Sequence, residues 1–241
     1  MIDALVSVRG LTRRFRRAAE TVTALDSVDL DLFPGELTVA AGPSGSGKTT
    51  LLSIIAGFEV PDAGSVAVGS FSGLANGGFA NGGVGLADSR AAPARLGWKH
   101  LAFVPQALAL FDELTVAENV DLPALLDPAA GRAGHPLAEL LSLLEIEHLA
   151  GRYPTETSGG EQQRTAVGRA LRLRPPLLLA DEPTGHQDRG RVDLVLGILR
   201  QHAYGGAAVL ISSHDEAVIS MADRVITLDD GRIVADSKVA V

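Results

Sequence analysis

Four short apolar segments along the chain each lead into a polar or glycine-rich tip. They are Leu37–Ala41 before Gly42, Leu101–Val104 before Gln106, Leu177–Ala180 before Asp181 and Glu182, and Ala208–Ile211 before His214. Apolar strands that alternate with helical segments are typical of a parallel sheet covered on both faces. Because ligands of such sheets gather beyond the carboxyl ends of the strands, we expect the four tips to share one crevice.

Helical patterns lie between these segments. Thr49–Ala56 is followed by Gly57, a common helix stop. An amphipathic helix is indicated by the spacing of Leu137, Leu140, Leu141 and Leu144. Two capping boxes that begin helices are predicted by the pairs Thr115 with Glu118 and Ser158 with Glu161.

The two ends of the chain show a different, β-type pattern. Val28, Leu30 and Leu32 alternate with polar residues before the turn at Pro34 and Gly35, which predicts antiparallel strands. Near the C-terminus, Asp230 and Gly231 separate two short apolar runs, 225–228 and 232–234, and so predict a hairpin. The expected fold class is therefore α/β, with a second and antiparallel β layer.

A glycine-rich stretch interrupts this pattern at residues 69–87. Its segment Ala75–Phe79 is nearly repeated by Ala80–Val84. Glycine loses much conformational freedom when it becomes ordered, so we expect a mobile loop or a turn-rich hairpin.

The composition favours one folded domain and disfavours charge-driven binding to nucleic acid. The 241 residues are 46% hydrophobic and 21% charged, with a net charge of −8, whereas nucleic-acid binding needs a positive surface. The cluster Arg13, Arg14, Arg16 and Arg17 is a local exception. A solvent-facing patch is the favoured interpretation of this cluster, and a contact to nucleotide phosphate or lipid headgroups is the alternative.

No segment of the sequence predicts export or a membrane span. Cysteine is absent, so disulfides and thiolate metal sites are excluded. The first residues lack a signal-peptide pattern, and no stretch reaches the roughly 18 apolar residues that cross a bilayer. A membrane role would have to come through a partner.

The sequence from Gly42 to Thr49 fits the phosphate-binding motif G-x-x-x-x-G-K-[ST], between a predicted strand and a predicted helix. Glycines let successive backbone N–H groups face phosphate oxygens at the helix N-terminus. Lys48 would reach the β and γ phosphates, and the Thr49 hydroxyl would hold Mg²⁺. A turn without function is disfavoured, because both flanks are correct.

Two further motifs fit the same chemistry. Acidic residues often end strands, but beside a phosphate loop Asp181 can hold Mg²⁺ and Glu182 can polarise the attacking water. Ser158, Gly159 and Gly160 predict a capped helix with uncovered N-terminal amides, which makes a second anion site. One nucleotide rarely needs two such sites from one chain.

Together these motifs resemble the ABC-type ATPases over nearly the whole chain, with the signature S-G-G-[EQ]-Q at Ser158 to Gln162. The resemblance implies a P-loop NTPase domain over 1–241, with a mainly parallel core sheet, an N-terminal antiparallel β subdomain and an inserted α-helical subdomain. Core and β subdomain would span 1–105 and 165–241, and the helical subdomain about 106–164.

The resemblance also assigns roles to single residues. Phe15 would stack on adenine, Gln106 would touch Mg²⁺ and the transporter partner, Asp188 would be the D-loop acid, and His214 would contact the γ-phosphate. Catalysis is expected from Glu182, His214 and Lys48, and Mg²⁺ coordination from Thr49, Gln106 and Asp181. The expected nucleotide-binding set is Phe15, Gly42, Pro43, Ser44, Gly45, Ser46, Gly47, Lys48, Thr49, Thr50, Gln106, Ser158, Gly159, Gly160, Glu161 and Asp188. The signature residues would act on ATP held by the other protomer.

Within the family, Glu182–Gly185 with Asp188, and Gly160–Arg164, look most like the lipoprotein-releasing and macrolide-exporter group. Three features depart from the usual pattern: Thr157 replaces a leucine, His186 and Gln187 stand in the D-loop, and the glycine-rich stretch is unusual. They put the turnover rate and D-loop signalling in question, not ATP binding.

The leading hypothesis is an ATP-hydrolysing transporter subunit at the cytoplasmic face of the cell membrane. Two copies, or a copy and a paired ATPase, would close around two Mg-ATP and drive a separate membrane permease, without direct nucleic-acid contact. The alternative is a non-transport ABC ATPase of a soluble or nucleic-acid machine, but the tandem cassettes, long coiled coils or basic face usual there are not seen. A P-loop kinase or GTPase would lack the Ser158 signature.

Overall fold

The computed structural model describes residues 3–17, 20–69, 96–185 and 189–238. Apart from Gly69, the glycine-rich stretch predicted at 69–87 lies outside the described residues. His186, Gln187 and Asp188 also lie outside them.

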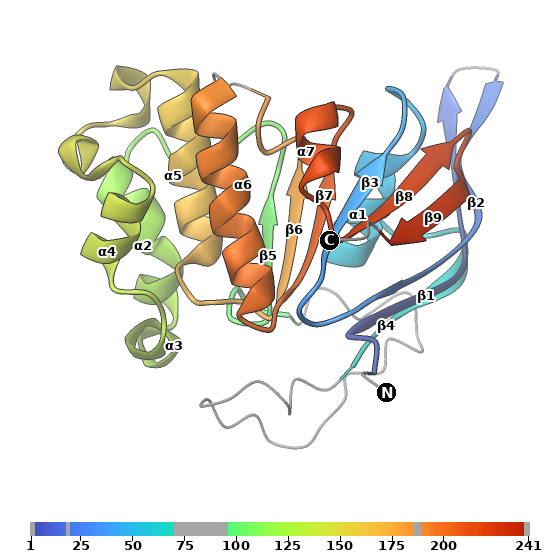
Figure 1. The fold of residues 1–241 in the computed structure, drawn as a ribbon, viewed down its shortest axis with the longest axis horizontal. Coiled ribbons are helices and arrows are strands. Elements are labelled where there is room, and N and C mark those ends of the chain that lie inside the picture. Colours follow the sequence, from blue (N-terminus) through green and yellow to red (C-terminus); the bar gives the residue numbers. More distant parts are fainter. Residues whose placement is uncertain (1–2, 18–19, 70–95, 186–188, 239–241) are drawn as a thin grey trace.

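A six-stranded sheet forms the centre of the molecule, in the order β5-β6-β7-β3-β8-β9 (Figure 1). Its strands are β3 (Leu37–Ala41), β5 (Leu101–Val104), β6 (Leu177–Asp181), β7 (Ala208–Ser212), β8 (Arg224–Asp229) and β9 (Arg232–Lys238). The first five strands in this order are parallel, and β9 pairs antiparallel with β8. The four apolar segments are thus confirmed as parallel neighbours, and the C-terminal hairpin is confirmed as β8 and β9.

A smaller antiparallel sheet, with the order β2-β1-β4, is the predicted second β layer. It consists of β1 (Val6–Arg17), β2 (Glu20–Leu32) and β4 (Ala63–Val68). Phe15 on β1 pairs with Val22 on β2. This register places both residues close to the tip of the long β1–β2 hairpin.

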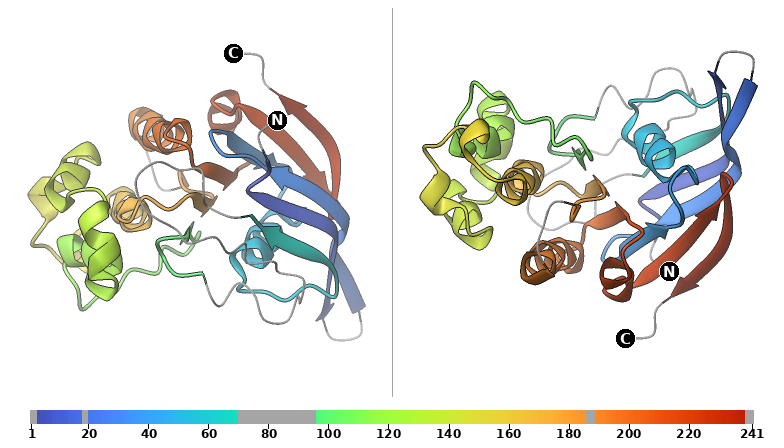
Figure 2. Two further views of the ribbon diagram at one scale, coloured as in Figure 1. Left: turned by 90° about the horizontal axis from the view of Figure 1, so that it is seen from below. Right: turned by 90° about the horizontal axis from the view of Figure 1, so that it is seen from above.

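Helices cover both faces of the central sheet, as Figure 2 shows for α1 (Lys48–Ala56) on one face and α6 (Arg189–Tyr204) on the other. Beyond the β5 edge lies a group of helices. Its members are α2 (Val116–Leu126), α3 (Pro128–Ala133), α4 (Leu137–Leu143), the short 3₁₀ turns η2 (Glu147–Leu149) and η3 (Pro154–Glu156), and α5 (Gly159–Leu171), while α7 (Glu216–Ser220) follows β7. The expected subdomain boundary at residue 164 falls inside α5.

Successive side chains of a strand point to opposite faces of the sheet. Because both faces of this sheet are covered, the parallel strands are buried throughout. In β6, Leu178 and Ala180 belong to the core beneath α5 and α6, whereas Leu177 and Leu179 belong to the core shared with α1 and the antiparallel sheet. This explains why the strands are continuously apolar in the sequence.

Both predicted capping boxes are confirmed. Thr115 and Glu118 begin α2, and Ser158 and Glu161 begin α5, each with the reciprocal side-chain and backbone hydrogen bonds of the motif. The predicted leucine helix is α4, whose Leu140 and Leu141 are buried. The cap at Thr115 fixes where α2 begins, and the cap at Ser158 fixes where α5 begins.

Candidate active site

The loop between β3 and α1 has the shape that the phosphate-binding motif requires. Gly42 has φ 141° and Gly47 has φ 105°, values that side-chain-bearing residues rarely adopt. A Cβ at Gly42 would lie 2.1 Å from the Leu228 carbonyl oxygen, and one at Gly47 would lie 2.3 Å from that of Ala24. Neighbouring backbone therefore restricts both positions to glycine.

Lys48 places a buried cation against this loop. Its side chain donates hydrogen bonds from Nζ to the Gly42 and Pro43 carbonyl oxygens, at 2.7 and 2.9 Å. No side chain caps the N-terminus of α1, so the positive end of the helix dipole faces the loop without a protein anion. This arrangement suits an anionic ligand such as phosphate.

A cavity of about 310 Å³ lies beside the loop and collects residues from distant parts of the sequence. Its lining is Phe15, Val22, Ala24, Ser44, Gly45, Gly47, Lys48, Thr49, Thr50, Gln106 and Glu182. Of the expected loop residues, Gly42, Pro43 and Ser46 do not line it. Ser46 is buried, and its Oγ has no hydrogen-bond partner among the described residues.

Glu182 is held at this cavity by the strand next to its own. It follows β6 with φ 49°, in the left-handed region, and its backbone N–H donates to the Ser212 carbonyl oxygen at 3.1 Å. His214 Nδ1 lies 2.8 Å from Glu182 Oε1, which requires the proton on Nδ1 for a hydrogen bond to the carboxylate. Strained backbone at a polar cavity is typical of functional sites.

Asp181 ends β6 directly behind Glu182. It is buried and accepts a hydrogen bond from the Ser212 hydroxyl on β7. Asp181 does not line the cavity, but Thr49 and Gln106 do. Hydroxyl, amide and carboxylate oxygens are the donors that Mg²⁺ prefers, so these three residue types fit the ion chemically. No preformed cluster of three or more His, Asp or Glu side chains occurs in the part of the chain that the structure describes.

The sequence pattern missed one wall of the cavity, formed by Val22 and Ala24 on β2. Phe15 lies opposite Val22 across the hairpin, and the Arg13 guanidinium stacks 4.7 Å from the Phe15 ring centre. Period-2 alternation puts Val22 and Ala24 on one face of β2, but no motif marks them. Arg13 also pairs with Glu59 and Asp62, so this member of the arginine cluster is bound within the protein.

The Ser158 signature stands apart from the cavity. Ser158, Gly159, Gly160 and Glu161 form the first turn of α5, and none of them lines the cavity. Ser158 donates its backbone N–H to Glu161 Oε2 at 2.8 Å, and this hydrogen bond is the main cause that lowers the pKa of Glu161. The first turn of α5 is thus a capped helix N-terminus that lies outside the cavity. Asp188 lies outside the described residues.

The helices that the structure describes include none with both the length and the apolar character needed to cross a bilayer.

Comparisons with known proteins agree with this geometry. A family profile described as ABC transporter matches residues 25–185. A lipoprotein-releasing system ATP-binding protein, LolD, of Gluconobacter oxydans is 40% identical, and the match covers 94% of each chain. The macrolide export ATP-binding/permease protein MacB of Rhodopseudomonas palustris is 37% identical over 98% of this chain and 34% of its own length.

Solved structures show the same likeness. The dimeric structure of MJ0796, a bacterial ABC transporter cassette, has a TM-score of 0.81 and 28% identity, and covers 98% of this chain and 99% of its own. A dimeric post-hydrolysis state of MJ0796 bound to ADP and Pi has a TM-score of 0.79. The family match over residues 25–185 and the near full-length relatives give one conclusion: the chain belongs to the ABC transporter family of ATP-binding, ATP-hydrolysing proteins.

Proposed function

We propose that two copies of this chain hold Mg-ATP between them and drive a separate membrane permease from the cytoplasmic face of the membrane. One observation carries the proposal. Lys48, Gln106 and Glu182 converge on one cavity, whereas the exposed first turn of α5, which Ser158 and Glu161 cap, lies outside it. In the proposed mechanism, the cavity residues bind the nucleotide and the first turn of α5 closes over it. These two parts do not meet within one copy of the chain.

The cavity can bind the nucleotide by simple contacts. The loop amides and the Lys48 ammonium would hold the β and γ phosphates. Phe15, Val22 and Ala24 offer an apolar wall against which a purine can stack. Thr49 and Gln106 reach the same space and are the proposed magnesium ligands there, with Asp181 behind them.

Glu182 has the position of a general base. Its carboxylate lines the cavity and is oriented by His214, so it can polarise a water that attacks the γ-phosphate. Mg²⁺, when bound, would neutralise charge on the phosphates. His214 is mostly exposed and is the proposed contact to the γ-phosphate.

The first turn of α5 supplies the proposed contact to the nucleotide of the second copy. Ser158 and Gly159 are exposed, and α5 has 13 residues, long enough for a full helix dipole to favour an anion at its N-terminus. Asp188 is the proposed D-loop acid of the same interface.

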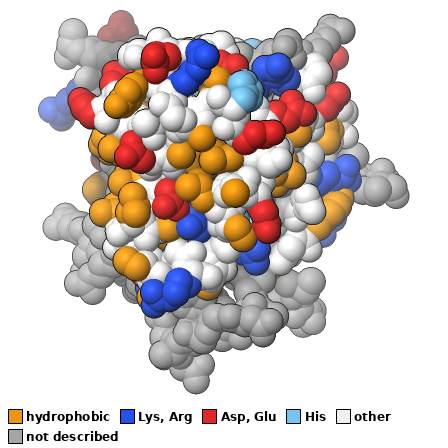
Figure 3. All heavy atoms as spheres, turned by 90° about the vertical axis from the view of Figure 1, so that its left-hand side faces the viewer, with side chains coloured by type: hydrophobic (Ala, Val, Ile, Leu, Met, Phe, Trp, Pro, Cys, Tyr) orange, Lys and Arg blue, Asp and Glu red, His pale blue; other side chains and the backbone are white. Residues whose placement is uncertain are grey.

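An exposed apolar surface supports a docking site for the permease. Phe58 is 70% exposed, Val60 51% and Trp98 39%, and a cavity of about 480 Å³ lies between Phe58, Trp98 and Arg169. Apolar side chains also gather on the face over the helical region (Figure 3). Exposed patches of this kind mark contacts to other proteins.

Changing Phe58 to Asp tests the permease part of the proposal. An unpaired carboxylate in an apolar interface is costly, so the amount of membrane protein recovered with the tagged chain from solubilised native membranes should fall by about tenfold or more. Val234→Asp is the matched control, because Val234 is 61% exposed on β9. Equal recovery with both variants, at unchanged ATP affinity, would place the docking surface elsewhere.

The relatives' names span lipoprotein release, sulfate or thiosulfate import and macrolide export. We infer that the cargo and the direction of transport are set by the membrane subunit, because relatives of similar sequence carry names for different cargoes and opposite directions.

A further inference from the structure

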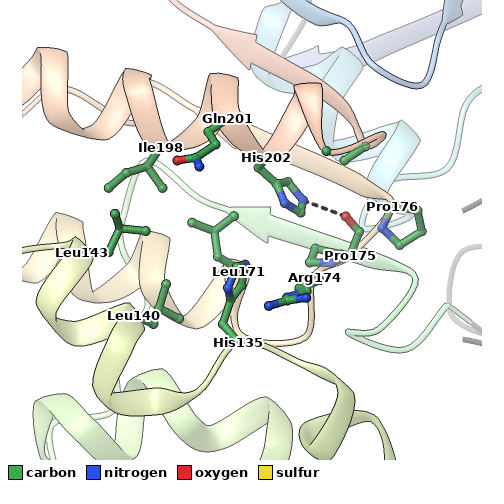
Figure 4. Close-up of a pocket in the computed structure, with 12 residues that line it drawn as sticks. His135, Leu140, Leu143, Leu171, Arg174, Pro175, Pro176, Ile198, Gln201 and His202 are labelled. Carbon is green, nitrogen blue, oxygen red and sulfur yellow. Dashed lines mark hydrogen bonds between the residues drawn. The ribbon is translucent and has the colours of Figure 1, made fainter. Parts of the chain in front are cut away.

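A third cavity lies at the end of the central sheet opposite the phosphate loop. It has a volume of about 440 Å³ and sits between α4, the end of α5, the end of α6 and the Pro175–Pro176 segment that leads into β6 (Figure 4). The nucleotide cavity lies at the carboxyl ends of the strands, whereas this one lies where β6 and β7 begin. Its size is in the range of small-molecule sites.

The walls divide into an apolar end and a polar end. Leu140, Leu143 and Ile198 lie on one side in Figure 4, where the Gln201 amide lies beside Ile198, and Arg174 lies on the other side, next to Pro175. His135 completes the polar end. A ligand with an alkyl chain and a polar head would match this division.

The charge of the polar end is positive and uncompensated. No Asp or Glu is among the residues that line the cavity, and the Arg174 side chain forms no ion pair within the described part of the chain. Burial is the main cause that lowers the pKa of His135 to about 4, and Arg174 adds to it, followed by smaller contributions from His202 and Arg172. Burial also lowers the pKa of His202, whose Nε2 lies 2.8 Å from the Pro175 carbonyl oxygen. Both imidazoles are neutral near pH 7, so the cavity carries one positive charge.

Backbone strain singles out Arg174. It has φ 51°, a conformation that favours glycine or asparagine and costs other residues about 1 kcal/mol or more. It also precedes Pro175, which restricts its backbone further. Arg174 is exposed and lines the cavity, and strained residues of this kind are candidates for binding roles.

We propose that this cavity binds an amphipathic monoanion, such as a medium-chain carboxylate, with its head on Arg174 and His135 and its chain among Leu140, Leu143 and Ile198. The guanidinium can hold a carboxylate with two parallel hydrogen bonds. Each buried methylene should strengthen binding by roughly fourfold. The site is independent of the nucleotide cavity and of the proposed transport function.

The test is an NMR titration of the full chain, without nucleotide, with octanoate, octanol and acetate. We expect saturable shifts of the amides around Leu140, Ile198 and Gln201 with octanoate. Binding should be weaker by about tenfold or more with uncharged octanol, and by about a thousandfold with acetate, which lacks six of the methylenes. Arg174→Asn keeps a residue that tolerates φ 51°, so it should fold normally and still bind octanoate about tenfold more weakly. Two variants are controls. Arg132→Asn removes the same charge from the exposed helix α3, and Lys48→Ala disables the nucleotide site. Both should bind octanoate as the wild type does.

Several results would overturn the proposal. These are no saturable shift at millimolar octanoate, equal binding of octanol or acetate, or unchanged affinity in Arg174→Asn. The comparison of octanoate with octanol on the wild-type chain decides the question even if a variant folds poorly.

Discussion

Two charged side chains, Lys48 and Glu182, define the chemistry of the nucleotide cavity. Lys48 is buried, and its hydrogen bonds to Gly42 and Pro43 hold its ammonium at the loop. Glu182 reaches the same cavity from the end of β6, with His214 as its partner. In the proposed mechanism these are the cation for phosphate and the carboxylate for water, and they come from α1 and from the end of β6.

Lys48→Ala should remove the cation that meets the phosphates. Nucleotide affinity should fall by about 10- to 100-fold, the range for hydrogen bonds to charged groups, and hydrolysis should be lost. Titration with a fluorescent ATP analogue and a phosphate-release assay measure these effects. Lys99→Ala is the control, because Lys99 pairs with Asp127 outside the cavity. Unchanged affinity and turnover in Lys48→Ala would refute the assigned role.

Among the helices and strands, the sequence predicts those features that depend on a few neighbouring residues. The apolar strands, the capping boxes at Thr115 and Ser158 and the β8–β9 hairpin each depend on a few neighbouring residues, and all are confirmed. The residues of the phosphate loop were predicted for the same reason, since a fixed spacing marks them.

Other parts depend on contacts between distant segments. The strand order β5-β6-β7-β3-β8-β9 is set by packing between distant segments, and no short sequence pattern predicts it. β1 carries register shifts at Val8, Leu11 and Arg13, and such irregularities break the alternation by which a strand is identified. Val22 and Ala24 join the site only because β2 passes beside the phosphate loop. Arg174 gives no sequence signal for its backbone conformation.

The close approach of β2 to the phosphate loop gives a prediction at this scale. Gly47→Ala would place a Cβ 2.3 Å from the Ala24 carbonyl oxygen, so the free energy of unfolding should fall by about 2–3 kcal/mol or more. Gly45→Ala is the matched control: Gly45 has φ 84°, but nothing lies within 4 Å of the added Cβ. It should lose only about 1 kcal/mol. If chemical denaturation gives the same loss of unfolding free energy for Gly47→Ala and Gly45→Ala, β2 does not constrain the loop.

In the whole molecule, the proposed mechanism leaves a single chain incomplete, because the cavity at Lys48 and the α5 turn that closes it would come from two copies. The cavity at Lys48 and the first turn of α5 belong to the same chain, but no residue of that turn lines the cavity. A second copy, placed so that its α5 faces the first copy's cavity, would complete both sites. ATP would then join the two copies, and hydrolysis would release them.

Glu182→Gln tests this central proposal most directly, because it keeps the shape of the side chain but removes its ability to accept a proton. Hydrolysis should slow by about 10²- to 10⁴-fold, so bound ATP should persist. Size-exclusion chromatography with light scattering should then detect a dimer only with ATP and Mg²⁺.

The decisive comparison adds Ser158→Arg to Glu182→Gln, which places bulk and a cation at the first turn of α5. The shared-site mechanism predicts that this double variant stays monomeric under saturating Mg-ATP, whereas Glu182→Gln with Ser237→Arg, a change on exposed β9, still forms the dimer. A Glu182→Gln chain that remains monomeric with ATP, or a Ser158→Arg double variant that dimerises equally well, would contradict the mechanism.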